Sequence, residues 1–254
     1  MTVVLAILFG VLIGALLGLI GGGGSILTVP ILVYILGQGV HEATSTSLVI
    51  VGATALFGAI PHARAGRVAM KTALLFGGAG IAGAFIGTAI NRLVSGPAIL
   101  LLFGVLMLVV ATRMALGRKR TDDESAMVPL SGFRWPVLVA GLIVGTMTGF
   151  FGVGGGFLIV PALVLVLHFP MRRAVGTSLV IIAINSTAGV IANLGSGNID
   201  LSLAAIFIVG GFVGSTLGSR AAGHIDETRL SRGFAALVVV IGVYLIIRNG
   251  LALV

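Results

Sequence analysis

Residues 18–30 read Gly18-Leu-Ile-Gly-Gly-Gly-Gly-Ser-Ile-Leu-Thr-Val-Pro30, and 131 positions later the chain reads Gly149-Phe-Phe-Gly-Val-Gly-Gly-Gly-Phe-Leu-Ile-Val-Pro161. The match extends in both directions from this stretch without a gap. Gly10 and Gly14 return as Gly141 and Gly145, and Thr46-Ser47-Leu48-Val49-Ile50 returns as Thr177-Ser178-Leu179-Val180-Ile181. A match of this length at one fixed offset indicates an internal duplication of the whole chain.

The composition indicates a protein that folds in lipid. Hydrophobic residues make up 58% and charged residues 9% of the chain, whereas soluble domains carry roughly 25% charged residues. Some apolar runs approach the roughly 20 residues that a helix needs to cross the hydrocarbon, and others are shorter. The runs are 2–20, 43–60, 72–90, 98–112, 137–151, 174–191, 201–218 and 234–247. We predict an all-α polytopic membrane protein with eight to ten membrane segments.

The basic residues are confined to a few regions, and this distribution predicts the topology. Thirteen of the 15 Lys and Arg residues fall within 64–71, 113–134, 172–173 and 220–232, which the positive-inside bias places in the cytoplasm. The net charge of +8 is therefore explained without a nucleic-acid partner. Loop 61–71 is basic whereas its equivalent at 193–201 is not, and loop 37–42 is not basic whereas its equivalent contains Arg172 and Arg173. The copies are therefore predicted to be inverted, with a first repeat at 1–117, a cytoplasmic linker at 118–134 and a second repeat at 135–254.

Each copy is expected to contain a glycine-broken helical hairpin followed by three fuller transmembrane helices. The breaks are residues 21–25 and 152–156. Each glycine within a helix costs roughly 1 kcal/mol relative to alanine, so consecutive glycines favour an interruption. The freed backbone groups must face protein or water rather than lipid. We expect two hairpins that enter the membrane from opposite sides, with Pro30 and Pro161 in the first turns of the half-helices after the breaks.

A half-helix that begins after a glycine-rich turn offers unpaired N–H groups and a positive dipole end, which together attract anions. The candidate substrate-binding residues are the break residues and the polar residues that follow them: Gly22, Gly23, Gly24, Ser25, Thr46, Ser47, Gly154, Gly155, Gly156, Thr177, Ser178 and Asn185. The hydroxyl pairs 46–47 and 177–178 donate to an anion, cap helices or bond back to the preceding turn. Asn185 serves either a function or a helix–helix bond. His62 and Arg64 either attract anions to the inner mouth or act as ordinary cytoplasmic anchors.

Residues suited to metal binding, catalysis or proton transfer are scarce in this chain. The chain has no cysteine, and its four histidines are expected at loop ends without the spacing of metal ligands. All seven acidic residues are expected in loops or the linker, which disfavours cation transport and a carboxylate proton relay. We therefore expect no metal, no cofactor and no enzymatic activity.

Two motifs, each present in both copies, resemble the sulfite exporter TauE/SafE family. The clearer copy has Gly149-Phe-Phe-Gly-Val-Gly-Gly-Gly156 with Val160-Pro161 and then Gly176-Thr-Ser-Leu179. The other has Gly18-Leu-Ile-Gly-Gly-Gly-Gly-Ser25 with Val29-Pro30 and then Ser45-Thr-Ser-Leu48. The resemblance covers nearly the whole chain. It implies a transporter, similar to toluene sulfonate uptake permeases, for small sulfur-containing anions in the inner membrane of a bacterium or archaeon.

The duplication and the resemblance together predict a secondary transporter of sulfite, sulfoacetate or other organosulfonates. The expected mode is export by alternating access around a midplane site between the repeats, which is how many duplicated transporters work. The alternative is a passive anion channel on the same scaffold. The expected partners are the small anionic substrate and membrane lipid, with no nucleic acid, and a homodimer is left open.

Overall fold

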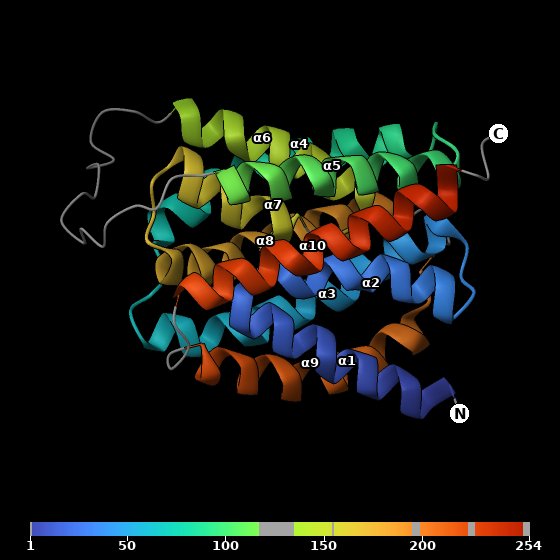
Figure 1. The fold of residues 1–254 in the computed structure, drawn as a ribbon, viewed down its shortest axis with the longest axis horizontal. Helices are drawn as coiled ribbons and strands as arrows, with labels where there is room; N and C mark the ends of the chain where they lie inside the picture. The colour runs from blue at the N-terminus through green and yellow to red at the C-terminus, as the bar shows by residue number, and fades with distance from the viewer. Residues whose placement is uncertain (1, 117–134, 154, 195–198, 223–226, 251–254) are drawn as a thin grey trace.

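The computed structural model describes residues 2–116, 135–153, 155–194, 199–222 and 227–250 (Figure 1). Within these ranges the chain forms ten α-helices and two short π-helices, and no strand. They are α1 (Thr2–Ile20), α2 (Gly23–Pro30), η1 (Ile31–Ile35), α3 (Val40–Arg64), α4 (Met70–Asn91), α5 (Gly96–Leu116), α6 (Trp135–Phe151), α7 (Gly156–Pro161), η2 (Ala162–Val166), α8 (Met171–Asn193), α9 (Leu201–Ala221) and α10 (Glu227–Gly250). Five of them, α1, α3, α4, α8 and α9, are long and apolar enough to cross a membrane. The predicted all-α polytopic membrane fold is confirmed, while the expected linker 118–134 lies outside the described residues.

The duplication visible in the sequence is also present in the order and the bounds of the helices. Helix α1 ends at Ile20 and α6 at Phe151, which are equivalent at the offset of 131. The π-helices at 31–35 and 162–166 correspond residue for residue, and α3, α4 and α5 begin at the positions equivalent to the starts of α8, α9 and α10. Each half therefore consists of a helix, a break, a short half-helix and three longer helices.

The first and third long helices of each half pack on the other half. Helix α1 lies against α9, and α6 lies against α4, on opposite sides of the central pair α3 and α8 (Figure 1). Glycines allow both contacts. A methyl group on Gly14 would lie 2.8 Å from Gly211 Cα, and one on the equivalent Gly145 would lie 2.5 Å from Gly80 Cα. Such small-residue faces let membrane helices approach closely.

The central helices α3 and α8 are equivalent in the repeat and run in opposite directions. A methyl group on Gly58, late in α3, would lie 3.6 Å from Leu179, which is early in α8. One on Gly189, late in α8, would lie 2.9 Å from Leu48, which is early in α3. Equivalent helices that run antiparallel relate the two halves by an axis perpendicular to the bundle. This antiparallel packing is what an inverted repeat predicts, while the inversion of the halves and the side of the membrane on which each loop lies stay predictions.

The position of the two prolines corrects one expectation. Pro30 and Pro161 are the last residues of α2 and α7, not first-turn residues, because these helices begin earlier than expected, at Gly23 and Gly156. A proline has no N–H to donate to the preceding turn. Directly after each proline the backbone widens into a π-helix, closed by the bonds from Leu36 N to Ile31 O (3.1 Å) and from Leu167 N to Ala162 O (3.2 Å).

Candidate functional site

The two glycine breaks meet at the centre of the molecule. Gly22 is the N-cap of α2, and Gly156 is the first residue of α7. A methyl group on Gly156 would lie 2.8 Å from Gly22 Cα, and one on Gly22 would overlap the Gly156 carbonyl group. Only glycine allows two backbones to come this close. The structure therefore brings together the N-terminal ends of two half-helices from different halves.

Serine hydroxyls lie beside this contact. Ser25 is fully buried, donates to the Gly22 carbonyl oxygen at 2.7 Å, and its Oγ lies 3.1 Å from the position of a methyl group on Gly156. Ser178 is fully buried and donates to Val175 O at 2.8 Å. Both hydroxyls are therefore next to the breaks, and each donates to the carbonyl oxygen of the residue three positions earlier in the chain.

Gly21 and Gly152 open the two breaks and were not among the predicted site residues. Their φ angles of +78° and +66° lie in the left-handed region, which glycine adopts at little cost. Each faces the serine motif of the other half. A methyl group on Gly21 would lie 2.6 Å from Ser178 Oγ, and Ser47 donates to the Gly152 carbonyl oxygen. Their presence at equivalent positions of both repeats was the signal that could have identified them.

Thr46 and Thr177 have the helix-capping role that the sequence left open. Thr46 Oγ1 accepts a hydrogen bond from the Asp200 N–H at 3.0 Å, just before α9. The equivalent Thr177 Oγ1 accepts one from the Ala69 N–H at 3.0 Å, just before α4. Each threonine thus ties the start of a helix in the other half to the central pair, and both hydroxyls retain a proton that can be donated.

The other predicted break residues face neighbouring helices. A methyl group on Gly24 would lie 2.8 Å from Leu17 N, so this glycine packs on α1. Gly155 is the N-cap of α7 with φ +65° and lies against Thr148 of α6. Gly23 is a buried residue of the first turn of α2. Gly154 lies outside the described residues.

Asn185 is fully buried one turn beyond Ile182, whose side chain lies against Gly156. Its carboxamide packs on Gly80 of α4, where a methyl group would lie 2.7 Å from Nδ2. Neither Oδ1 nor Nδ2 has a hydrogen-bond partner among the described residues. A buried amide without partners is costly, so the structure does not supply the helix–helix bond that the sequence left open for this residue.

The two residues predicted at the inner mouth differ in exposure. Arg64 is exposed at the end of α3, as expected for a residue that meets solvent or head groups. His62 is only 2% exposed, and its Nε2 lies 3.1 Å from the Gly18 carbonyl oxygen at the end of α1. Because the side chain is buried against the end of α1, His62 does not line an exposed mouth.

The charged residues are divided between the two ends of the bundle. The end at which α3 and α9 finish and α8 begins carries basic side chains: Arg64, Arg67, Lys71, Arg172, Arg173 and Arg220. Glu42 and Asp200 lie at the opposite end, whereas Glu227, also expected in a loop, is the first residue of α10 at the basic end. Glu42, which was expected in a loop, lies in the first turn of α3, where negative charge suits the helix dipole. Asp200 caps α9 by accepting from Leu203 N at 2.9 Å. No cluster of three potential metal ligands occurs in the described part of the chain.

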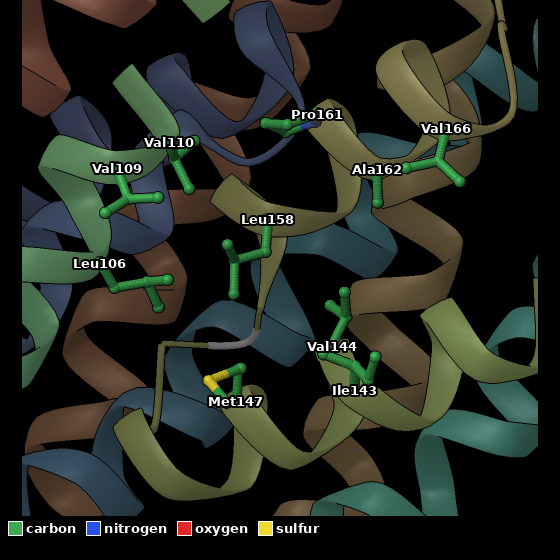
Figure 2. Close-up of a pocket in the computed structure, with 10 residues that line it drawn as sticks. All are labelled: Leu106, Val109, Val110, Ile143, Val144, Met147, Leu158, Pro161, Ala162 and Val166. Carbon is green, nitrogen blue, oxygen red and sulfur yellow. The ribbon is translucent and has the colours of Figure 1, made fainter. Parts of the chain in front are cut away.

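A cavity of about 300 Å³ lies between α5, α6 and the second half-helix (Figure 2). All ten side chains around it are apolar: Leu106, Val109, Val110, Ile143, Val144, Met147, Leu158, Pro161, Ala162 and Val166. An anion would find no hydrogen-bond donor among these side chains. The cavity is therefore not the candidate anion site.

Comparisons with known proteins agree with this architecture. A family model described as sulfite exporter TauE/SafE matches residues 6–245. A probable membrane transporter protein of Xylella fastidiosa (strain 9a5c) is 38% identical over 251 residues, which cover 96% of this chain and 95% of that protein. The probable membrane transporter protein YunE of Bacillus subtilis (strain 168) is 30% identical over 240 residues, covering 86% of this chain and 88% of its own length. No solved structure matches the chain significantly.

Proposed function

This chain belongs to the sulfite exporter TauE/SafE family, and we propose that it exports small sulfur oxyanions across the inner membrane of a prokaryote as a secondary transporter. The proposed substrates are sulfite, sulfoacetate and other organosulfonates. The observation that carries the proposal is the contact between Gly22 and Gly156, in which the glycine breaks of both halves meet.

The electrostatics of this contact favour an anion. The N-terminal end of a helix carries the equivalent of roughly half a positive charge. Helices α2 and α7 direct two such ends at one point, where they repel each other unless negative charge lies nearby. Glu42 and Asp200 lie at one end of the bundle and Glu227 begins α10 at the other. No Asp or Glu is found among the buried side chains of the described residues. A bound oxyanion would supply the missing charge.

The groups around the contact suit weak, reversible binding. Ser25 and Ser178 can rotate from their present carbonyl acceptors toward an anion, because a hydroxyl proton is free to turn. No Lys or Arg is found among the buried side chains of the described residues. Neutral donors bind an anion without the several kcal/mol needed to bury a full charge. A transporter needs such modest affinity, since it must also release its substrate.

The arrangement of the halves supports alternating access. The glycine breaks of the two halves meet, and the antiparallel helices α3 and α8 bring the serine motif of each half to the break of the other half. A rocking motion of one half against the other would open the shared site first to one side and then to the other, as in other duplicated transporters.

Counterflow in proteoliposomes tests this function. Vesicles preloaded with unlabelled sulfite or sulfoacetate should transiently accumulate the labelled anion, and the initial rate should saturate with concentration. A flux that rises linearly with concentration and shows no counterflow would instead indicate a passive anion channel. Absence of flux for every sulfur oxyanion, with folded protein in the vesicles, would contradict the proposal.

A further inference from the structure

We propose that His62 is a proton-binding site coupled to the anion site: protonation of its imidazole and binding of an anion at the glycine breaks strengthen each other. This inference rests on the proposed function, since it assumes that an oxyanion binds at the breaks. It assigns to His62 a role different from attracting anions at an exposed mouth.

The geometry of His62 leaves one ring nitrogen free to take a proton. The side chain is 2% exposed, and its Nε2 lies 3.1 Å from the Gly18 carbonyl oxygen. A carbonyl oxygen only accepts, so Nε2 must carry the hydrogen of this bond. In the neutral ring Nδ1 is then an acceptor, and it has no partner among the described residues. Protonation at Nδ1 would keep the bond to Gly18.

His62 also lies where the two parts of the anion site adjoin. Its partner Gly18 stands three residues before Gly21, which opens the first break. On its other side, a methyl group on Gly176 would lie 3.1 Å from His62 Cβ. Gly176 directly precedes the Thr177-Ser178 motif, and Ser178 Oγ faces Gly21. The His62 side chain therefore lies between the end of α1 and the start of α8, beside the break.

The charges around His62 explain why its proton needs an anion. Helix α1 contributes no charged side chain. The positive charge of Arg67, in the loop after α3, repels a protonated His62. The charged residues at this end of the bundle include Arg64 on α3, Lys71 on α4, Arg172 and Arg173 on α8, Arg220 on α9, and Glu227, which begins α10. No carboxylate bonds the His62 ring among the described side chains, so a positive imidazole has no bonded counter-charge. An anion at the breaks would provide it, and by linkage each ligand then raises the affinity for the other by the same factor.

The repeat makes this arrangement specific to one end of the molecule. The residue equivalent to His62 is Asn193, whose Nδ2 donates to Gly189 O of its own helix at 2.9 Å. An amide does not titrate in the physiological range, so the second half lacks the corresponding proton site. His41, at the opposite end of the bundle, has its Nδ1 3.0 Å from Asn91 Oδ1 and is a matched control.

Calorimetry on the purified full chain, with methanesulfonate and isethionate as probes, tests the coupling. Both sulfonates stay fully ionised between about pH 5 and pH 9, so any proton taken up belongs to the protein. The wild-type chain should take up as much as one proton per anion, detected as a difference between buffers of unlike ionisation enthalpy. Its affinity should fall by as much as roughly tenfold per pH unit above the range in which the imidazole titrates.

His62→Gln is the decisive variant, because the glutamine amide can still donate to Gly18 O but cannot titrate. It should bind the sulfonates with no proton uptake, with an affinity that varies less than about twofold with pH, and as tightly as wild type near pH 9. His41→Gln should behave as wild type.

Sulfonate binding by wild type without proton uptake would overturn the inference, as would proton uptake that survives in His62→Gln. Loss of binding by His62→Gln near pH 9 would also overturn it, since His62 would then be structural. Failure of the wild-type chain to bind or transport any sulfur oxyanion would instead contradict the proposed function.

Discussion

Gly22 and Gly156 touch through their backbones, so that a methyl group on Gly156 would lie 2.8 Å from Gly22 Cα. They come from different halves of the chain, and each stands at the N-terminal end of a half-helix. The contact is therefore both the closest approach of the two breaks and the point at which an anion would neutralise two dipole ends.

Gly22→Ala is expected to abolish transport while the protein still inserts and folds. The added methyl group would overlap the Gly156 carbonyl and push the half-helices apart. The measurement is counterflow of labelled sulfite or sulfoacetate at matched protein content. Gly78→Ala is the control, because a methyl group on this exposed glycine of α4 meets nothing within 4 Å. Equal activity of the two variants would mean that the close contact is not required for function.

Thr177→Val is expected to lower the free energy of unfolding by about 1 kcal/mol, because the buried Ala69 N–H would lose its acceptor. Denaturant unfolding of the purified protein measures this change. Thr177→Ser keeps the hydroxyl and should be close to wild type. If Thr177→Val weakened anion binding but left stability unchanged, Thr177 would act as a ligand and not as a cap.

Ser178→Ala is expected to weaken anion binding by about 0.5–1.5 kcal/mol, the contribution of one hydrogen bond. Ser178→Asp should abolish binding, because a carboxylate beside Gly21 would repel the anion in a poorly screened site. Thermal shift with added anion reads out both variants. Thr187→Ala is a suitable control, since Thr187 makes the same kind of bond within α8, to Ala183 O at 2.8 Å, but is exposed. Wild-type affinity in Ser178→Asp would move the site away from this motif.

The inverted arrangement predicts which loops share a side of the membrane. Single cysteines can be introduced cleanly because the chain has none of its own. A cysteine at Leu93 (85% exposed) or Leu194 (67% exposed) should react with an impermeant reagent from outside the cell. A cysteine at the exposed Ala65 should react only from the cytoplasmic side. Labelling of position 194 only from the cytoplasm would contradict inversion of the second half.

Much of the fold was predictable from local features of the chain. The offset between Gly18–Pro30 and Gly149–Pro161 predicted two equivalent units, and consecutive glycines predicted where each first helix ends. The half-helices were expected to follow the breaks at 21–25 and 152–156 but begin within them, at Gly23 and Gly156, because glycines that break one helix can still form the first turn of the next. The π-helical widening after Pro30 was not predicted, since it depends on how the backbone is held after a missing N–H.

The candidate site was less predictable, because the direction in which a residue points depends on the helix against which it packs. Gly22 and Gly24 belong to one glycine run, yet the first meets the other break while the second packs on α1. Likewise the sequence left open whether Thr46 donates to an anion or caps a helix, and its hydroxyl accepts the N–H of Asp200 from the other half. Nothing in the local sequence distinguishes these alternatives, since they differ only in the direction that each side chain takes.

By itself, the sequence determined the class of protein, the duplication and the position of the breaks, because apolar run length, glycine content and repeat spacing act on neighbouring residues along the chain. Only the tertiary structure decided which breaks meet, which hydroxyls cap the other half and that His62 turns inward to Gly18. The physical reason is the exchange of neighbours between halves: α1 packs on α9 and α6 on α4. Thr177 and Thr46 therefore find their partners 108 and 154 residues away, and His62 finds its partner 44 residues away, at distances along the chain that no local pattern records.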